Sequence, residues 1–160
     1  MLKLWINCVK RIGSIVFIFN KIVILLGGYN VSTEQTSYKF EQGIPGFEHL
    51  TQFIFEEVGD NLPMKLMKAG DEPSISLLVA DPFLFYPEYE WQLPDHVKEE
   101  LGITSEEEVE IWSVLTINTD FANATINLLA PIILNRRMLL GKQLILHDNT
   151  YSSRAPLNQT

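Results

Sequence analysis

The chain has 160 residues, of which 46% are apolar, so it has room for one domain and can bury a core without disulfides or metal ions. Its formal net charge of −8 argues against direct binding to a nucleic-acid backbone, and its single cysteine, Cys8, excludes an intrachain disulfide. Nothing in this composition requires an oxidising compartment, and we expect a cytoplasmic protein.

The first 28 residues differ from the rest because they contain basic residues and no acidic one. The apolar run 12–19 resembles part of a signal peptide, but Asn20-Lys21 interrupts it before the roughly 20 residues that cross a bilayer. We therefore expect no stable membrane association, with tethering through this segment as the alternative. We assign residues 1–28 to an N-terminal extension, which contains a first strand at 22–26 or reflects a mis-assigned start, and residues 29–160 to a β-barrel domain.

Short runs rich in β-branched and aromatic residues, separated by turn residues, predict strands over most of the remaining chain. The expected strands cover residues 51–58, 64–69, 74–80, 83–93, 109–117, 124–130, 131–135 and 142–147. Pro87 restricts the fourth of these to an edge or bent position, and Gly141 is expected in the turn before the last. Strands of this length predict a mostly β fold, a barrel or a sandwich, and we expect a single small antiparallel barrel-like domain. We expect the free protein to be a monomer.

One short helix is predicted near residues 95–101. Asp95 suits the N-cap of this helix, and Gly102 stands where a glycine commonly ends one. The helix therefore has about two turns, by the usual helical repeat.

Catalytic and metal sites find little support in the sequence. His49, His96 and His147 are far apart, and neither a zinc-ligand spacing nor a G-x-S-x-G motif is present. The acidic run 106–110 lacks the residue order of a calcium-binding loop. We therefore expect no catalytic residue, no cofactor and no metal ion.

The aromatic stretch "DPFLFYPEYEW" is a candidate for partner binding. Strand alternation predicts Phe83 and Phe85 in the core, which leaves Tyr86, Glu88 and Tyr89 as surface contacts for a protein partner. The alternative is that all the aromatic residues fill the core.

Acidic residues are concentrated in the middle of the chain. Residues 41–110 contain seventeen acidic residues and three lysines, a local charge of −14. Such a field attracts a basic partner and speeds association, and Glu106, Glu107 and Glu108 are the densest candidates for that contact. The alternative is that these acids only keep the protein soluble.

The stretch "FEQGIPGFEHL" predicts a tight reversal between strands. Gly43 and Gly46 can adopt positive φ, and Pro45 restrains its own φ near −65°. Phe40 and Phe47 are expected to anchor the two ends of the turn in the core. No phosphate-binding loop is indicated, because no Lys-Ser or Lys-Thr pair follows the glycines.

Four motifs, "FEQGIPGFE", "LLVADPFLFYPEYE", "NLLAPIILN" followed by "GKQLIL", and "YSSRAPL", occur in the order and spacing of the flagellar assembly factor FliW family. Over about residues 40–157 the chain resembles that family. The resemblance implies a small cytoplasmic β-barrel without enzymatic activity that binds two proteins in competition. These are flagellin and CsrA, an RNA-binding regulator that represses flagellin translation.

The resemblance directs attention to the polar residues Glu41, Gln42 and Glu48 at the rim of the glycine turn, as further candidates for partner binding. Residues 138–140 depart from the family pattern, because they are apolar where polar residues are expected. A rival hypothesis is a small β-barrel enzyme or ligand carrier with Asp81, Glu88 and His147 in the barrel mouth.

Overall fold

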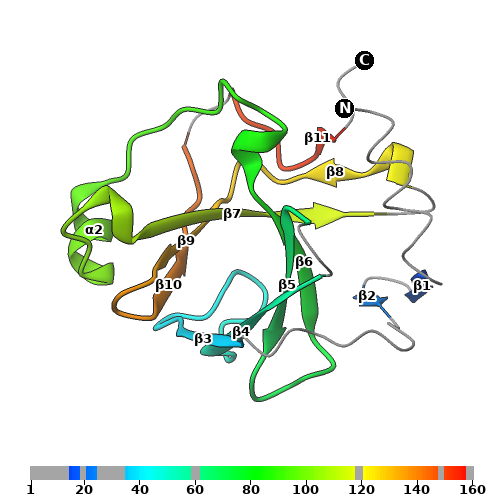
Figure 1. Ribbon diagram of the computed structural model, residues 1–160, viewed down its shortest axis with the longest axis horizontal. Coiled ribbons are helices and arrows are strands. Elements are labelled where there is room, and N and C mark those ends of the chain that lie inside the picture. The colour runs from blue at the N-terminus through cyan, green and yellow to red at the C-terminus, as the bar shows by residue number, and fades with distance from the viewer. Residues whose placement is uncertain are drawn as a thin grey trace.

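A closed barrel dominates the computed structural model, which describes residues 15–18, 21–24, 35–58, 62–117, 121–147 and 150–157 (Figure 1). Within these residues, seven strands close the barrel. They are β3 (Thr36–Lys39), β4 (Gln52–Glu57), β5 (Met64–Ala69), β6 (Ser76–Ala80), β7 (Val109–Thr116), β9 (Ile132–Asn135) and β10 (Leu140–Gln143). The expected mostly β barrel is confirmed, and most strands begin and end close to the predicted residues.

Strand β7 closes the barrel by pairing with different neighbours along its length. Residues 109–112 pair with β9, and residues 113–115 pair with β6. Every pairing around the ring is antiparallel except that of β3 with β10, which is parallel at Lys39 and Leu140. Two short strands extend the sheet beside the C-terminal end of β7: β8 (Thr125–Ile126) pairs with residues 115 and 116, and β11 (Ala155–Pro156) pairs with β8. The strand expected at 124–130 is therefore much shorter than predicted.

A separate antiparallel hairpin precedes the barrel in the chain. It consists of β1 (Ile15–Ile18) and β2 (Lys21–Ile24). Strand β2 overlaps the strand expected at 22–26, of which residues 25 and 26 lie outside the described residues. In the described part of the chain, no helix has the length and apolar character needed to cross a membrane.

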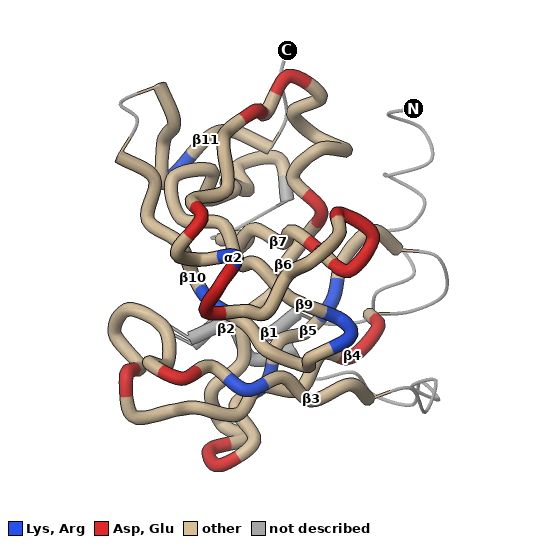
Figure 2. The backbone as a smooth tube through the Cα atoms, turned by 90° about the vertical axis from the view of Figure 1, so that its left-hand side faces the viewer, with Lys and Arg blue, Asp and Glu red and all other residues tan. Residues whose placement is uncertain are grey.

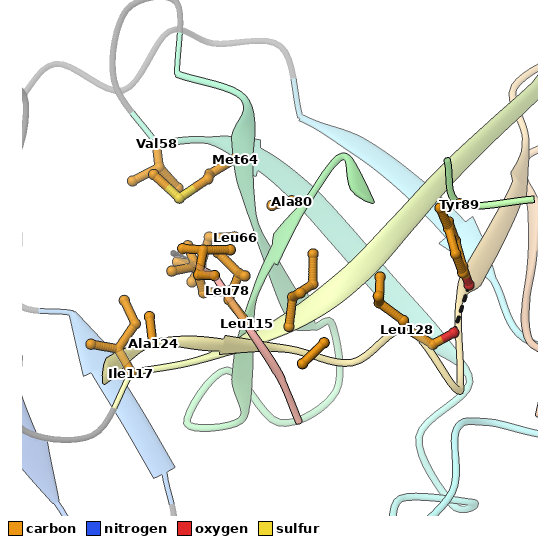
Figure 3. Close-up of a cluster of buried hydrophobic side chains, with 13 residues drawn as sticks. Val58, Met64, Leu66, Leu78, Ala80, Tyr89, Leu115, Ile117, Ala124 and Leu128 are labelled. Atoms are coloured by element: carbon orange, nitrogen blue, oxygen red, sulfur yellow. Dashed lines mark hydrogen bonds between the residues drawn. The ribbon is translucent and has the colours of Figure 1, made fainter. Parts of the chain in front are cut away.

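Two apolar clusters cover opposite faces of the sheet, because successive residues of β5, β6 and β7 belong alternately to one and to the other. One contains Phe40 and Phe53, which meet edge to face at 5.0 Å, and the other contains Leu66, Leu78 and Leu115 (Figure 3). The four residues of β9 are all buried, which alternation alone would not give. The reason is that both faces of β9 are covered, as in strands that carry a helix on the outer side.

Helix α2 (Asp95–Leu101) provides that outer cover. Its buried residues Val97 and Leu101 form a third cluster with Ile133 of β9. The helix ends at Gly102, which has a φ of 63° and donates its N–H to Glu99 O, as expected. The prediction that Asp95 is the N-cap is wrong, because Pro94 occupies that position. Asp95 is the first helical residue and forms an ion pair with Lys98 one turn later. Figure 1 shows α2 at one end of β7 and β8 at the other.

The strand expected at 83–93 is absent from the described structure. In its place, the 3₁₀ helix η1 (Pro82–Leu84) is followed by turns. Asp81 accepts a hydrogen bond from Phe83 N at 2.9 Å, and Pro82 occupies the first helical position, so the local sequence starts a helical turn rather than a strand.

Gly141 also differs from its prediction, because it lies within β10, and residues 136–139 form the turn. A Cβ atom at Gly141 would lie 2.4 Å from the ring of Phe40. The glycine therefore permits close packing of β10 against the core rather than a reversal of the chain.

Candidate functional site

Two grooves adjoin helix α2 and share it as a wall. The first, the Phe83 groove, has a volume of about 1290 Å³ and is lined by Phe83, residues 89–95, Lys98, residues 103–106, Val109 and Ile111. The second, the Lys142 groove, has a volume of about 720 Å³. It lies between the glycine turn after β3 and residues 140–147, with Glu100 and Leu101 of α2 at its side.

Three tyrosine hydroxyls hold the segment that forms one wall of the Phe83 groove. Tyr86 Oη donates to Pro156 O at 2.5 Å, and Tyr89 Oη donates to Leu128 O at 2.7 Å (Figure 3). Tyr151 Oη donates to Glu90 O at 2.5 Å and accepts from Glu90 N at 3.1 Å. Residues 86–90 are thereby tied to segments 39 or more positions further along the chain.

This support leaves two large apolar side chains in solvent. Phe83 is 42% exposed and Leu84 is 59% exposed, so the prediction that Phe83 belongs to the core is wrong. Phe85 is partly buried and packs against the cluster that contains Leu66 and Leu115. The helical turn of η1 accounts for the difference, because it replaces the strand alternation on which the prediction depended.

The three partner-binding candidates in this segment have different environments. Glu88 is exposed, whereas Tyr86 is half-buried with its hydroxyl occupied by Pro156. Tyr89 is only 4% exposed, and burial raises the pKa of its hydroxyl. The prediction of a surface position for Tyr89 is therefore wrong, because its ring completes the core under the segment.

The three glutamates of the 3₁₀ helix η2 (Glu106–Glu108) also differ in their environments. Glu106 and Glu107 are exposed, and only Glu106 lines the Phe83 groove. Glu108 accepts hydrogen bonds from Thr104 N at 3.0 Å and from Arg137 Nε at 2.6 Å. These bonds, above all that from the Thr104 backbone, lower the pKa of Glu108 from 4.5 to about 2. The carboxylate of Glu108 therefore holds Thr104, which lines the groove, and is not free to bind a partner.

Ion pairs between lysine or arginine and acidic residues neutralise many of the charges in the described part of the chain. The pairs are Lys39–Glu41, Lys65–Glu57, Lys68–Glu56, Lys98–Asp95, Arg136–Glu110, Arg137–Glu108 and Lys142–Glu100. Glu88, Glu90, Glu99, Glu106 and Glu107 are exposed and take part in none of these pairs. Figure 2 shows how the acidic residues are distributed over the loops and α2. Of these five glutamates, Glu90 and Glu106 line the Phe83 groove, and the Lys142 groove is lined by one exposed acid outside the pairs, Glu48.

The Lys142 groove brings together the three polar candidates of the glycine turn. Glu41, Gln42 and Glu48 are all exposed and all line it. Glu41 pairs with Lys39 at 2.6 Å, and Glu48 accepts a hydrogen bond from Gly46 N at 2.9 Å. The candidates are thus correctly placed at a rim, and their role in partner binding stays a prediction.

The expected geometry of the glycine turn is confirmed. Gly43 and Gly46 have φ values of 64° and 86°. Phe40 is fully buried and Phe47 packs against the same cluster, as predicted, while the burial of Ile44 between the glycines was not foreseen.

Asn135 is a buried polar residue that sequence reasoning missed. Its Nδ2 donates to Leu101 O at 2.9 Å, and its Oδ1 accepts from Arg137 N at 2.9 Å and Met138 N at 3.1 Å. This side chain joins the end of α2 to the β9–β10 turn, where Met138 and Leu139 are 46% and 44% exposed. The available signal was the asparagine that ends the apolar run "PIILN", since a buried polar residue needs hydrogen-bond partners.

The groups proposed for an enzyme or ligand carrier are not brought together in either groove. His147 lines the Lys142 groove, whereas Asp81 and Glu88 line neither groove. Asp81 instead caps η1 through Phe83 N. Within the residues that the structure describes, no group of three or more histidine, cysteine, aspartate or glutamate side chains could hold a metal ion.

Comparison with protein-family models identifies the family. A model described as "FliW protein" matches residues 25–157. The chain belongs to the FliW family. The resemblance inferred from four motifs is therefore confirmed.

Individual FliW relatives are similar in sequence to this protein over most of its length. The flagellar assembly factor FliW of Bacillus subtilis (strain 168) is 35% identical over 131 residues, which are 82% of this chain and 91% of that protein. The flagellar assembly factor FliW of Moorella thermoacetica is 41% identical over 119 residues, which are 74% of this chain and 75% of that protein. A crystal structure of the flagellar assembly factor FliW superposes with a TM-score of 0.74 at 32% identity, covering 82% of this chain and 92% of the other. The relatives and the fold thus both support a role in flagellar assembly.

Proposed function

We propose that this protein is a non-enzymatic cytoplasmic regulator of flagellar assembly that binds CsrA and flagellin alternately. The observation that carries the proposal is the FliW family match over residues 25–157. When flagellin accumulates, it occupies the protein and frees CsrA to repress the flagellin message. When flagellin is exported, the protein binds CsrA again and translation resumes.

The charge distribution supports the CsrA half of the cycle. Glu90, Glu106 and Glu107 are exposed and have no cationic partner among the ion pairs, so they leave a negative field on one side of the barrel. Such a field accelerates encounter with a basic protein, and the acceleration weakens as salt is added.

The exposed apolar side chains support the flagellin half. Phe83 and Leu84 project from a segment held by tyrosines, and Met138 and Leu139 from the β9–β10 turn. Exposed apolar groups on rigid supports are suited to bind an unassembled protein that presents an apolar face.

The test is a binding assay with purified CsrA and purified flagellin at low and at moderate salt. We expect a complex with each, mutual displacement between the two, and slower CsrA association at the higher salt. Absence of binding to both partners at low salt would contradict the proposal. Complexes that form but do not exclude each other would contradict the alternating cycle.

The boundary of the N-terminal extension stays part of this proposal. We expect that residues 1–14, upstream of β1 and β2, are not needed for either complex. Mass measurement of the N-terminus of the protein purified from its own cells determines whether the extension is present. Loss of either complex after removal of residues 1–14 would contradict the assignment.

A further inference from the structure

One flank of β7 lacks a neighbouring strand beside the Phe83 groove. Strand β6 pairs with residues 113–115 of β7 and ends at Ala80, where the chain turns away into η1. Residues 109–112 are paired with β9 on the opposite flank. Among the described residues, therefore, this part of β7 pairs with a strand on one side only.

The hydrogen bonds of neighbouring residues show which backbone groups face the unpaired flank. Arg136 N donates to Glu108 O, and Asn127 N donates to Val114 O, so even-numbered residues of this segment direct their backbone groups toward β9 and β8. Backbone groups of an antiparallel strand alternate between its two flanks, so those of Val109 and Ile111 face the other side. Val109 N donates to Glu106 O, so among the described residues Val109 O and both backbone groups of Ile111 are left for a further partner.

The groove beside this edge combines apolar and acidic side chains. Phe83, Trp91 and Ile111 supply the apolar lining, and Phe83 is 42% exposed. Glu90 and Glu106 also line the groove, and neither belongs to an ion pair with a described lysine or arginine. The groove therefore offers backbone hydrogen bonds, apolar contacts and negative charge to the same ligand.

We propose that the Phe83 groove binds an extended segment of a partner protein, which adds a strand to the unpaired edge of β7 at residues 109–112. The segment carries apolar residues at alternate positions and lysine or arginine at its flanks, to match Glu90 and Glu106. The inference deepens the proposed binding function and rests on it, because it assigns the surface and the conformation of the bound segment. A helical segment satisfies its own backbone groups and would leave Ile111 without partners.

The first experiment selects ligands without presupposing their sequence. A phage-displayed library of 12-residue peptides is panned against the full chain, and the consensus peptide is synthesised with a fluorescent label. We expect alternating apolar positions with basic flanks. N-methylation of every second amide in one register should weaken binding by about tenfold or more, and the same change in the other register should have little effect, because only alternate amides bond to β7.

Matched variants of the protein locate the bound peptide. Phe83→Ala and Glu106→Gln should each weaken it by about fivefold or more, as expected for contacts in the middle of a binding groove. The controls are Leu84→Ala and Glu107→Gln, which alter neighbouring exposed side chains that do not line the groove. Each control should change the affinity less than about twofold. Melting curves verify that all four variants remain folded.

Three outcomes would overturn the inference. They are no enrichment of such peptides, equal loss of affinity from N-methylation in both registers, and equal effects of groove and control variants. A second copy of the chain on the edge would also overturn it, and would appear as a dimer in sedimentation that Phe83→Ala dissolves. If CsrA and flagellin bind while the peptide assays fail, the proposed function stands and only this surface assignment is wrong.

Discussion

The Phe83 groove and the Lys142 groove lie beside the same helix but are built in different ways. The wall of the first is an aromatic segment tied down by the hydroxyls of Tyr86, Tyr89 and Tyr151. The wall of the second is a turn that depends on the positive φ of Gly43 and Gly46. Side-chain hydrogen bonds can hold large apolar groups in solvent, whereas a glycine turn presents mainly polar ones.

The grooves also differ in how their charges are compensated. In the Lys142 groove, Lys39 pairs with Glu41 and Lys142 pairs with Glu100, so Glu48 is the one lining acid outside the ion pairs of the described residues. In the Phe83 groove, Lys98 pairs with Asp95, and Glu90 and Glu106 are left over. The Phe83 groove thus has two lining acids outside the ion pairs and the Lys142 groove has one, so the Phe83 side should contribute more to electrostatic steering.

The largest expected loss of stability comes from a substitution in the glycine turn. For Gly43→Ala we expect a loss of about 2–4 kcal/mol in the free energy of unfolding, from positive φ and steric overlap together. The added Cβ would lie 2.6 Å from Phe47 O and 2.8 Å from Glu48 Cα. Gly46→Ala is the control, because its φ is 86° but nothing lies within 4 Å of the new Cβ. Equal losses in urea titrations of the two variants would contradict the close approach at Gly43.

A smaller effect is expected from the tyrosine support of the Phe83 groove. Tyr89→Phe removes the hydrogen bond to Leu128 O inside the core and should cost about 1–3 kcal/mol in the free energy of unfolding. Tyr151→Phe is the control, since its bonds to Glu90 lie at the surface and their loss should cost less, about 1 kcal/mol. If thermal melts rank the two variants in the opposite order, the buried bond does not hold the segment.

The hydrogen bonds that Glu108 accepts from Thr104 and Arg137 should make the stability of the protein depend on pH. The pKa of Glu108 is lowered from 4.5 to about 2, so the stability that its carboxylate contributes is present above pH 4.5 and is lost as the pH falls toward 2. Glu108→Gln should therefore lose less stability than the unmodified protein over this interval, as measured by urea unfolding at a series of pH values. The control Glu107→Gln leaves the Glu108 bonds intact, and a profile for it like that of Glu108→Gln would refute the assignment.

The smallest effect on stability, and a clear one on kinetics, is expected from the exposed acids. Replacing both Glu106 and Glu107 with Lys should leave the free energy of unfolding within about 0.5 kcal/mol, because both side chains are exposed. The same double variant should slow association with CsrA at low salt by about tenfold. The matched control replaces Glu41 and Glu48 with Lys, which changes the net charge equally at the Lys142 groove. Equal slowing of both double variants in stopped-flow measurements would remove the distinction between the grooves.

Local sequence patterns predicted much of the architecture. The strand at 64–69 was placed without error, and the helix at 95–101 and the glycine turn at 43–46 followed from residues that have few conformational options. The predictions failed where a local cap competed with alternation, as at Asp81, and where packing required a glycine, as at Gly141.

By itself the sequence determined the family, the β class, the helix at 95–101 and the excess of acidic residues. Only the tertiary structure decided which of these residues face solvent: Phe83 but not Tyr89, and Glu106 but not Glu108. The physical reason is that these outcomes depend on partners distant in the chain. Tyr89 bonds to a carbonyl 39 positions away and Glu108 to an arginine 29 positions away. No local periodicity encodes such contacts, or the unpaired edge of β7 that results where β6 ends.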